Sequence, residues 1–120
     1  MEDMRLGVVE EEFANIIWEN EPLSSGELVK LCQTRLEWKK STTYTVLKKL
    51  CERGIFKNEN SMVSSIISKQ EYFAIKSESF VDSIFEGSLP AFIAAFTKRK
   101  KLSEDEIVQI RSIIDKYGEE

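Results

Sequence analysis

The chain has 120 residues, 42% of them hydrophobic, and a formal net charge of −4, so it is large and apolar enough to fold and too small for more than two short domains. It contains no histidine and no metal-ligand spacing, so we expect neither an enzyme, nor a cofactor, nor a metal site. No apolar run reaches the roughly 18–20 residues of a membrane helix, and residues 1–6 lack a signal-peptide pattern, which predicts a cytoplasmic protein without membrane insertion.

Two helices are predicted in the first third of the chain. The first covers residues 9–20, because its apolar side chains recur at three- and four-residue steps and glutamates stand in its first turn. Glu21-Pro22 is expected to end it, since proline disfavours helical backbone in the residue before it. Ser24 and Glu27 then have the spacing of a capping box, which predicts a short second helix that ends near Thr34.

A third helix is predicted over residues 41–53, with Ser41 as its N-cap and Gly54 as the left-handed residue after its end. Trp38, just before it, is expected to fill part of the core. Helical spacing separates two faces. The face expected to be buried consists of Thr43, Val46, Leu47, Leu50 and Cys51. The face expected to be exposed consists of Tyr44, Thr45, Lys48 and Lys49.

A β-hairpin is predicted next, with strands over 55–57 and 62–68 and a four-residue turn at 58–61. Helix, short helix, helix and hairpin is the element order of a winged helix-turn-helix. The predicted fold class is therefore mostly α with a small β-hairpin, and we place a winged-helix domain at residues 1–68.

Residues 69–120 are predicted to form a separate domain of three helices, with Ser68, Ser88 and Ser103 as N-caps. Three short amphipathic helices rarely bury enough area by themselves, so we expect a homodimer in which a second copy covers them. The alternative is that this segment folds back on its own winged-helix domain. The side chains expected in the dimer interface are Phe80, Ile84, Phe92, Ile93, Phe96, Ile107, Ile110 and Ile114.

Basic side chains are concentrated around the third helix. Residues 38–57 hold six basic and one acidic side chain, whereas residues 1–37 carry a net −6 and residues 58–120 a net −3. A solvated helix face with lysine-rich ends explains this pattern as well as a phosphate-binding surface does. The second helix of a helix-turn-helix enters the major groove of double-stranded DNA. The residues expected to contact DNA are Lys39, Lys40, Ser41, Thr42, Tyr44, Thr45, Lys48 and Lys49, and Lys57 on the wing.

Other interpretations of the same pattern stay open. A winged helix can serve as a protein-interaction module without binding DNA. The phenylalanines of the C-terminal domain could line a small-molecule pocket, although such a stripe is more often dimer core. Cys32 and Cys51 each lie in an apolar helical pattern, which favours buried thiols over a disulfide, redox or metal role.

The ordered set of motifs resembles the penicillinase and methicillin-resistance repressor family of the BlaI/MecI/CopY type. Residues 38–54, WKKSTTYTVLKKLCERG, are similar to its recognition-helix signature of a tryptophan, two threonines three residues apart, a basic residue, a leucine and a final glycine. Residues 16–18, IIW, match its first helix, and residues 92–96 and the LSEDEI of residues 102–107 resemble its dimerisation segment. The resemblance implies a dimeric repressor of an antibiotic-resistance or stress operon, which binds a pseudo-palindromic operator.

In the best-known members a membrane sensor protease cuts the repressor just before a phenylalanine. The matching bond here joins Ala95 and Phe96, but the family carries asparagine where this chain has Ala95. A second departure is the Ser-Ile-Ile of residues 65–67, where the family often has aromatic residues. The copper-responsive branch carries a Cys-x-Cys pair near its C-terminus, which this chain lacks, so a copper switch is not expected.

Overall fold

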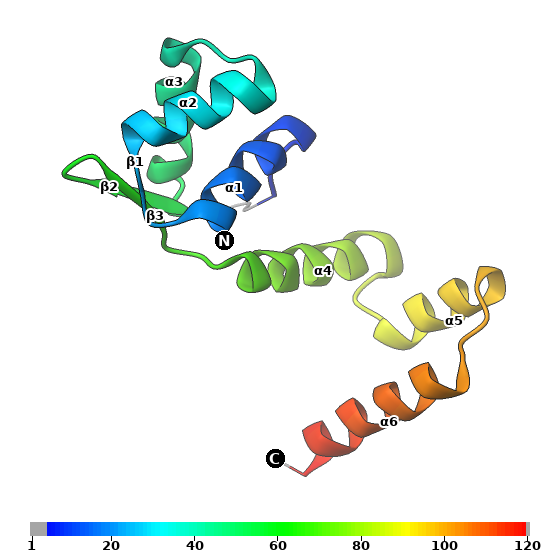
Figure 1. Cartoon of the computed structure of the whole chain (residues 1–120). Coiled ribbons are helices and arrows are strands. Elements are labelled where there is room, and N and C mark those ends of the chain that lie inside the picture. The colour runs from blue at the N-terminus through cyan, green and yellow to red at the C-terminus, as the bar shows by residue number, and fades with distance from the viewer. Residues whose placement is uncertain (1–4, 120) are drawn as a thin grey trace. The chain divides into compact units, whose positions relative to one another are not determined.

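The computed structural model describes residues 5–119, which form six α-helices and a three-stranded antiparallel sheet (Figure 1). Of residues 1–6, in which no signal-peptide pattern was found, residues 1–4 therefore lie outside the described part. The chain divides into two compact units, which we call unit 1 (up to Glu78) and unit 2 (from Ser79), and the division falls within one helix.

Unit 1 has the winged helix-turn-helix fold that the element order predicted. Its elements are α1 (Val8–Asn20), β1 (Leu23–Ser24), α2 (Ser25–Leu36), α3 (Lys40–Glu52), β2 (Phe56–Glu59), β3 (Met62–Ser65) and the first part of α4 (Lys69–Phe85). Unit 2 contains the rest of α4, α5 (Leu89–Arg99) and α6 (Glu104–Gly118). Among residues 5–119 no single helix is long and apolar enough to cross a membrane, and only the bent pair of α4 and α5, taken together, meets that test of length and composition.

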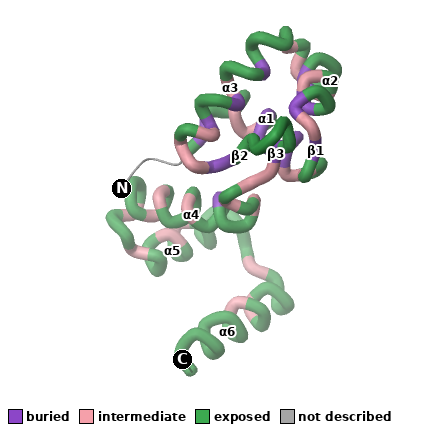
Figure 2. Tube along the Cα trace, turned by 90° about the vertical axis from the view of Figure 1, so that its left-hand side faces the viewer, coloured by how far each residue is buried: buried purple, intermediate pink, exposed green. Residues whose placement is uncertain are grey.

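One apolar core holds unit 1 together, and Figure 2 shows the buried residues gathered there. Phe13 and Ile17 of α1, Leu50 of α3 and Phe56 of β2 are completely buried in it. Trp38 stacks on Phe13 with 5.5 Å between ring centroids, so it fills the core edge as predicted. Burial of these large side chains is the main stabilising contribution to the fold, because apolar surface removed from water stabilises in proportion to its area.

The caps of α2 and α3 differ in how well the sequence predicted them. Ser24 caps α2 as expected: its Oγ accepts from the Glu27 N–H at 3.0 Å, and Glu27 Oε1 accepts from the Ser24 N–H at 3.3 Å. The prediction of Ser41 as the N-cap of α3 was wrong. Lys39 occupies that position with extended backbone, and its carbonyl accepts from the Thr43 N–H at 3.1 Å, which brings Ser41 into the first helical turn.

The wing is tighter than predicted and has an additional strand. Asn60 and Ser61 alone connect β2 to β3, and both have positive φ angles (53° and 63°), as in the two-residue turns that match the strand twist. The prediction of a four-residue turn was therefore wrong. The second strand also ends at Ser65 rather than at residue 68. β1 pairs with β3, with Leu23 opposite Val63, so the sheet order is β1-β3-β2.

Unit 2 has well-formed helices but, over residues 79–119, no buried side chain (Figure 2). The predicted caps are confirmed: Ser88 Oγ accepts from the Ala91 N–H and Ser103 Oγ from the Glu106 N–H, each at 3.1 Å. The rings of Phe80, Phe85, Phe92 and Phe96 contact one another without being enclosed. The unit therefore leaves several large apolar side chains exposed, among them Ile84, Leu89 and Ile113.

Candidate nucleic-acid interface

The two faces of α3 are separated as its sequence predicted. Thr43, Leu47 and Leu50 are buried, and Val46 and Cys51 are partly buried. The opposite face is open: Tyr44, Thr45, Lys48 and Lys49 are all exposed. The aliphatic side of the helix thus anchors it to unit 1, while a side rich in hydroxyl and ammonium groups is available to a partner.

Two hydroxyl groups on this face are already hydrogen bonded. Tyr44 donates through its hydroxyl to Ser25 Oγ at the start of α2 at 3.2 Å, so the ring is held across the two helices of the helix-turn-helix. Thr45 donates through Oγ1 to the Ser41 carbonyl at 2.9 Å. Because its only proton is used within the helix, Thr45 offers an acceptor oxygen and a methyl group rather than a donor. This favours apolar contact with a thymine methyl over a hydrogen bond donated to a base.

The start of α3 attracts anions. The first backbone N–H groups of any helix lack partners within the helix, and no side chain caps those of α3. Lys39 and Lys40 are exposed beside them, together with the hydroxyls of Ser41 and Thr42. No acidic side chain stands in this first turn. Helix dipole, free donors and ammonium groups therefore all favour a phosphate at this end.

A shallow hollow separates α3 from the wing. It is lined by Tyr44, Leu47, Lys48, Cys51 and Asn58. Lys57 is exposed on β2, next to Asn58 along that strand. The helix thus contributes an ammonium group to this depression through Lys48. Lys57 adds an exposed cation elsewhere on the wing, because neighbouring residues of a strand point to opposite faces of the sheet.

Lys49 is exposed but lies in a different environment from Lys48. Its Nζ is 3.0 Å from Glu10 Oε2 on α1, and Arg53 Nη1 is 3.9 Å from Glu10 Oε1. The Gly7 N–H, followed by Lys49 and Arg53, holds the pKa of the Glu10 carboxyl below its usual value. Within the described chain, Lys39, Lys40 and Lys48 form no ion pair. Within residues 38–57, the lysines without an ion pair are therefore Lys39 and Lys40 at the start of α3, Lys48 on its exposed face and Lys57 on the wing.

Unit 2 carries the residues expected at the dimer interface and the bond expected to be cut. Phe80, Ile84, Ile93, Phe96 and Ile114 are exposed, and Phe92, Ile107 and Ile110 are partly exposed. Phe92, Ile93, Phe96, Ile110 and neighbouring residues line an apolar groove between α5 and α6. The Ala95–Phe96 bond lies inside α5, so cleavage there requires that helix to open locally.

The thiols and acidic groups show no site of another kind. Cys32 and Cys51 are free thiols, and burial raises the pKa of both, which makes them less reactive. Cys32 is buried as predicted, but Cys51 is only partly buried, because it lies at the hollow between α3 and the wing. Across residues 5–119, no group of three or more cysteine, aspartate or glutamate side chains could hold a metal ion.

Sequence reasoning missed Tyr72, the largest fully buried side chain of the molecule's described part. Its hydroxyl donates to Glu11 Oε2 at 3.0 Å and accepts from the Leu6 N–H at 3.1 Å. A signal for it exists in the sequence. Ser68 caps α4, so Ile67 and Tyr72 occupy the two positions of a hydrophobic staple, which fixes how a chain enters a helix.

Comparison with known proteins gives a consistent result over nearly the whole chain. The family model described as penicillinase repressor matches residues 6–116. The methicillin resistance regulatory protein MecI of Staphylococcus aureus strain Mu50 is 26% identical over 109 residues, which are 88% of this chain and 89% of that protein. The penicillinase repressor of Bacillus licheniformis is 23% identical over 110 residues, covering 88% and 86% of the two chains. The penicillinase repressor of Staphylococcus aureus is 25% identical over 116 residues, covering 93% and 92%.

Proposed function

Because the chain belongs to the penicillinase repressor family, it is a transcriptional repressor, and we propose that it acts as a homodimer on a pseudo-palindromic DNA operator. The observation that carries the proposal is the exposed face of α3, where Tyr44, Thr45 and Lys48 lie beside an uncapped, lysine-flanked helix start. A helix-turn-helix contacts base edges with the N-terminal part of its second helix. In this chain that part is the end of α3 beside Lys39 and Lys40.

Each residue of the interface has a role that follows from its chemistry. Lys39, Lys40 and the first N–H groups of α3 bind phosphates and fix the position of the helix on the duplex. Thr45 and Lys48 face the bases: the threonine methyl suits thymine, and the ammonium group suits the acceptors of guanine. Lys57 adds a backbone contact from the wing. The ion pair of Lys49 with Glu10 makes Lys49 the weakest contributor of the set.

Dimerisation supplies the affinity that one such module lacks. A single module with few phosphate contacts binds weakly at physiological salt. Two modules joined through unit 2 bind two half-sites with a high effective concentration, provided that the half-sites are correctly spaced. The exposed apolar side chains of α4, α5 and α6 support this assignment, because no described residue of unit 2 is buried within one chain.

The regulated genes and the release step follow from the relatives. Their names refer to methicillin resistance and penicillinase, so we propose an antibiotic-resistance operon, or a related stress operon, as the target in the cytoplasm. A sensor protease that cut the Ala95–Phe96 bond would separate α6 and the end of α5 from the rest of unit 2. Loss of these interface residues would weaken the dimer and thereby its binding to the operator.

The test is selection of bound duplexes from a random pool with the intact protein, followed by titration of the selected sequence. A palindrome is expected. The Lys48→Ala variant should bind it more weakly and with a relaxed preference at the base that Lys48 contacts, whereas Lys40→Ala should lower the slope of log affinity against log salt by about one. Lys116→Ala, which removes an exposed lysine from α6, is the matched control and should change none of these quantities. No enriched sequence, or an unchanged affinity for Lys48→Ala, would instead favour a winged-helix protein-interaction module.

A further inference from the structure

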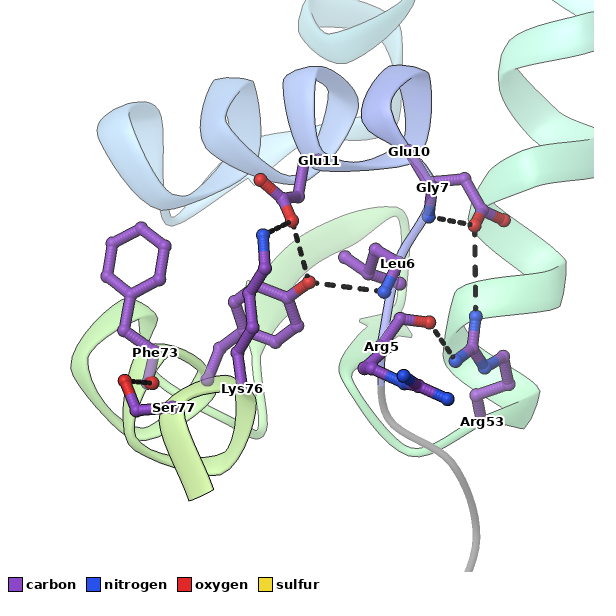
Figure 3. A network of polar contacts seen from close by, with 10 residues as sticks. Arg5, Leu6, Gly7, Glu10, Glu11, Arg53, Phe73, Lys76 and Ser77 are labelled. Atoms are coloured by element: carbon purple, nitrogen blue, oxygen red, sulfur yellow. Dashed lines mark hydrogen bonds and ion pairs between the residues drawn. The ribbon is translucent and has the colours of Figure 1, made fainter. Parts of the chain in front are cut away.

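Two neighbouring glutamates of α1 bind two different helices. Glu10 forms an ion pair with Lys49 near the end of α3, with 3.0 Å between Oε2 and Nζ. Glu11 accepts a hydrogen bond from the Tyr72 hydroxyl at 3.0 Å and forms an ion pair with Lys76, and both of these residues lie on α4. Figure 3 shows Glu11 beside Lys76 and Glu10 beside Arg53. α1 is thus linked at once to α3 and to the first two turns of α4.

The segment before α1 adds a second connection between the same helices. Arg53, the C-cap of α3, donates through Nη2 to the Arg5 carbonyl at 2.8 Å. The next residue, Leu6, has a buried side chain and donates its N–H to the Tyr72 hydroxyl at 3.1 Å. We call these contacts the α1 joint. Its members are Arg5, Glu10, Lys49 and Arg53 on the side of α3, and Leu6, Glu11, Tyr72 and Lys76 on the side of α4.

Tyr72 is the central residue of the α1 joint. Its side chain is only 1% exposed, its ring lies 5.4 Å from that of Trp18, and its hydroxyl makes both hydrogen bonds described above. A buried hydroxyl with both bonds formed resists displacement, because loss of either bond leaves a polar group without a partner and without water. The exposed ion pair of Lys76 contributes less by itself, since solvent screens it.

We propose that Tyr72, supported by Glu11 and Lys76, is a positioning residue that fixes the direction of α4 relative to α3 and so determines which half-site spacing the repressor accepts. The inference rests on the proposed dimer and operator. α4 runs as one helix from unit 1 into unit 2 and is therefore the covalent link between the two units. The α1 joint holds the part of this helix that lies in unit 1. Trp18 Nε1 donates to the Ile67 carbonyl at 3.0 Å and holds the point where α4 begins. Tyr72 and Lys76, one and two turns later, hold its direction.

The consequence for DNA binding is geometric. Adding one base pair between half-sites moves them apart by about 3.4 Å and rotates one about the helix axis by about 35°. A firmly held first part of α4 favours one spacing, because other spacings require the contacts of the α1 joint to rearrange. A loosened connection lets the two DNA-binding surfaces adjust to neighbouring spacings. It also lowers the effective concentration of the second surface at the preferred spacing, so the affinity for that spacing falls.

The experiment measures affinity for duplexes that carry two selected half-sites at separations changed one base pair at a time, and for a single half-site. The wild-type protein should prefer one separation by at least about tenfold over separations two base pairs away. The double variant Tyr72→Phe/Lys76→Met keeps the buried ring and removes the polar contacts of α4 with Glu11. We expect it to reduce this preference at least about threefold, with single-half-site affinity and self-association unchanged.

Matched variants separate this effect from reduced stability or altered charge. Lys69→Met removes a lysine from the same helix outside the α1 joint, and its spacing profile should equal that of the wild type. If the double variant is unfolded by circular dichroism, the milder Glu11→Gln is compared with Glu12→Gln, a change to the neighbouring exposed carboxylate. A wild-type profile in the joint variant, or a wild-type protein without spacing preference, overturns the inference and leaves the repressor assignment intact. Failure of the wild-type protein to bind any duplex overturns the repressor assignment itself.

Discussion

Replacing Ile114 by serine should dissociate the proposed dimer while leaving the monomer folded. Ile114 lies on α6 with 59% of its surface exposed. Complete burial of an isoleucine side chain stabilises by about 1.5–3 kcal/mol, so burial of the exposed part contributes about 1–2 kcal/mol in each protomer. A two-fold interface contains the residue twice, which gives about 2–4 kcal/mol for the dimer. At about 1.4 kcal/mol for each factor of ten, the dissociation constant should rise between roughly 30-fold and several hundredfold.

Sedimentation equilibrium of the wild-type and variant proteins over a range of concentrations measures this change directly. The matched control is Val8→Ser, which removes a β-branched side chain that is 79% exposed on α1, outside unit 2. The control should associate as the wild type does. A wild-type protein that remains monomeric at high micromolar concentration, or equal dissociation constants for the Ile114→Ser variant and the wild type, would refute the assignment of unit 2 as the dimer interface.

Three further predictions concern unit 1. Leu50→Ala should lower the free energy of unfolding by about 2–5 kcal/mol in urea denaturation, because Leu50 is completely buried, and a decrease below about 1 kcal/mol would contradict the core assignment. Ser61→Gly should raise it by up to about 1 kcal/mol, because Ser61 has a φ of 63° that glycine adopts without strain; a loss of stability would contradict this. Contact with Lys76, followed by that with Tyr72, holds the pKa of Glu11 below its usual 4.5, so the folded state gains stability above that pH and loses it as pH falls through the lowered value. Denaturation midpoints measured between about pH 3 and pH 6 should therefore fall more steeply for the wild type than for Glu11→Gln, and equal slopes would contradict the assignment.

The sequence predicted the helices of unit 1 well because each carries two kinds of local information. Apolar spacing marks the buried face, and a capping residue such as Ser24 marks the start. The start of α3 was misplaced because Ser41 is a good N-cap residue in isolation. The backbone instead turns at Lys39, where Thr43 donates both its N–H and its Oγ1 to the same carbonyl.

The features that the sequence did not predict depend on contacts between distant residues. β1 has two residues, too few for a period-two pattern, and it forms because Leu23 and Ser24 pair with β3 about forty residues later. The hydrogen bond between Tyr44 and Ser25 is of the same kind, as are the bonds of the Tyr72 hydroxyl with Leu6 and Glu11. Periodicity within one helix shows which side chains share a face. It does not show which other element that face meets.

The acidic net charge of the chain is compatible with DNA binding because the carboxylates of α1 act locally. Glu10 neutralises Lys49 near the C-terminal end of α3, and Glu11 neutralises Lys76 on α4. Neither carboxylate pairs with Lys39, Lys40 or Lys48, so the field at the start of α3 remains positive at close range. Over distances beyond about 8–10 Å at physiological salt, screening removes most of the influence of the remaining negative charges. A mutation that moves a carboxylate to the start of α3 should therefore reduce operator affinity far more than the same charge added to α6, although both change the net charge equally.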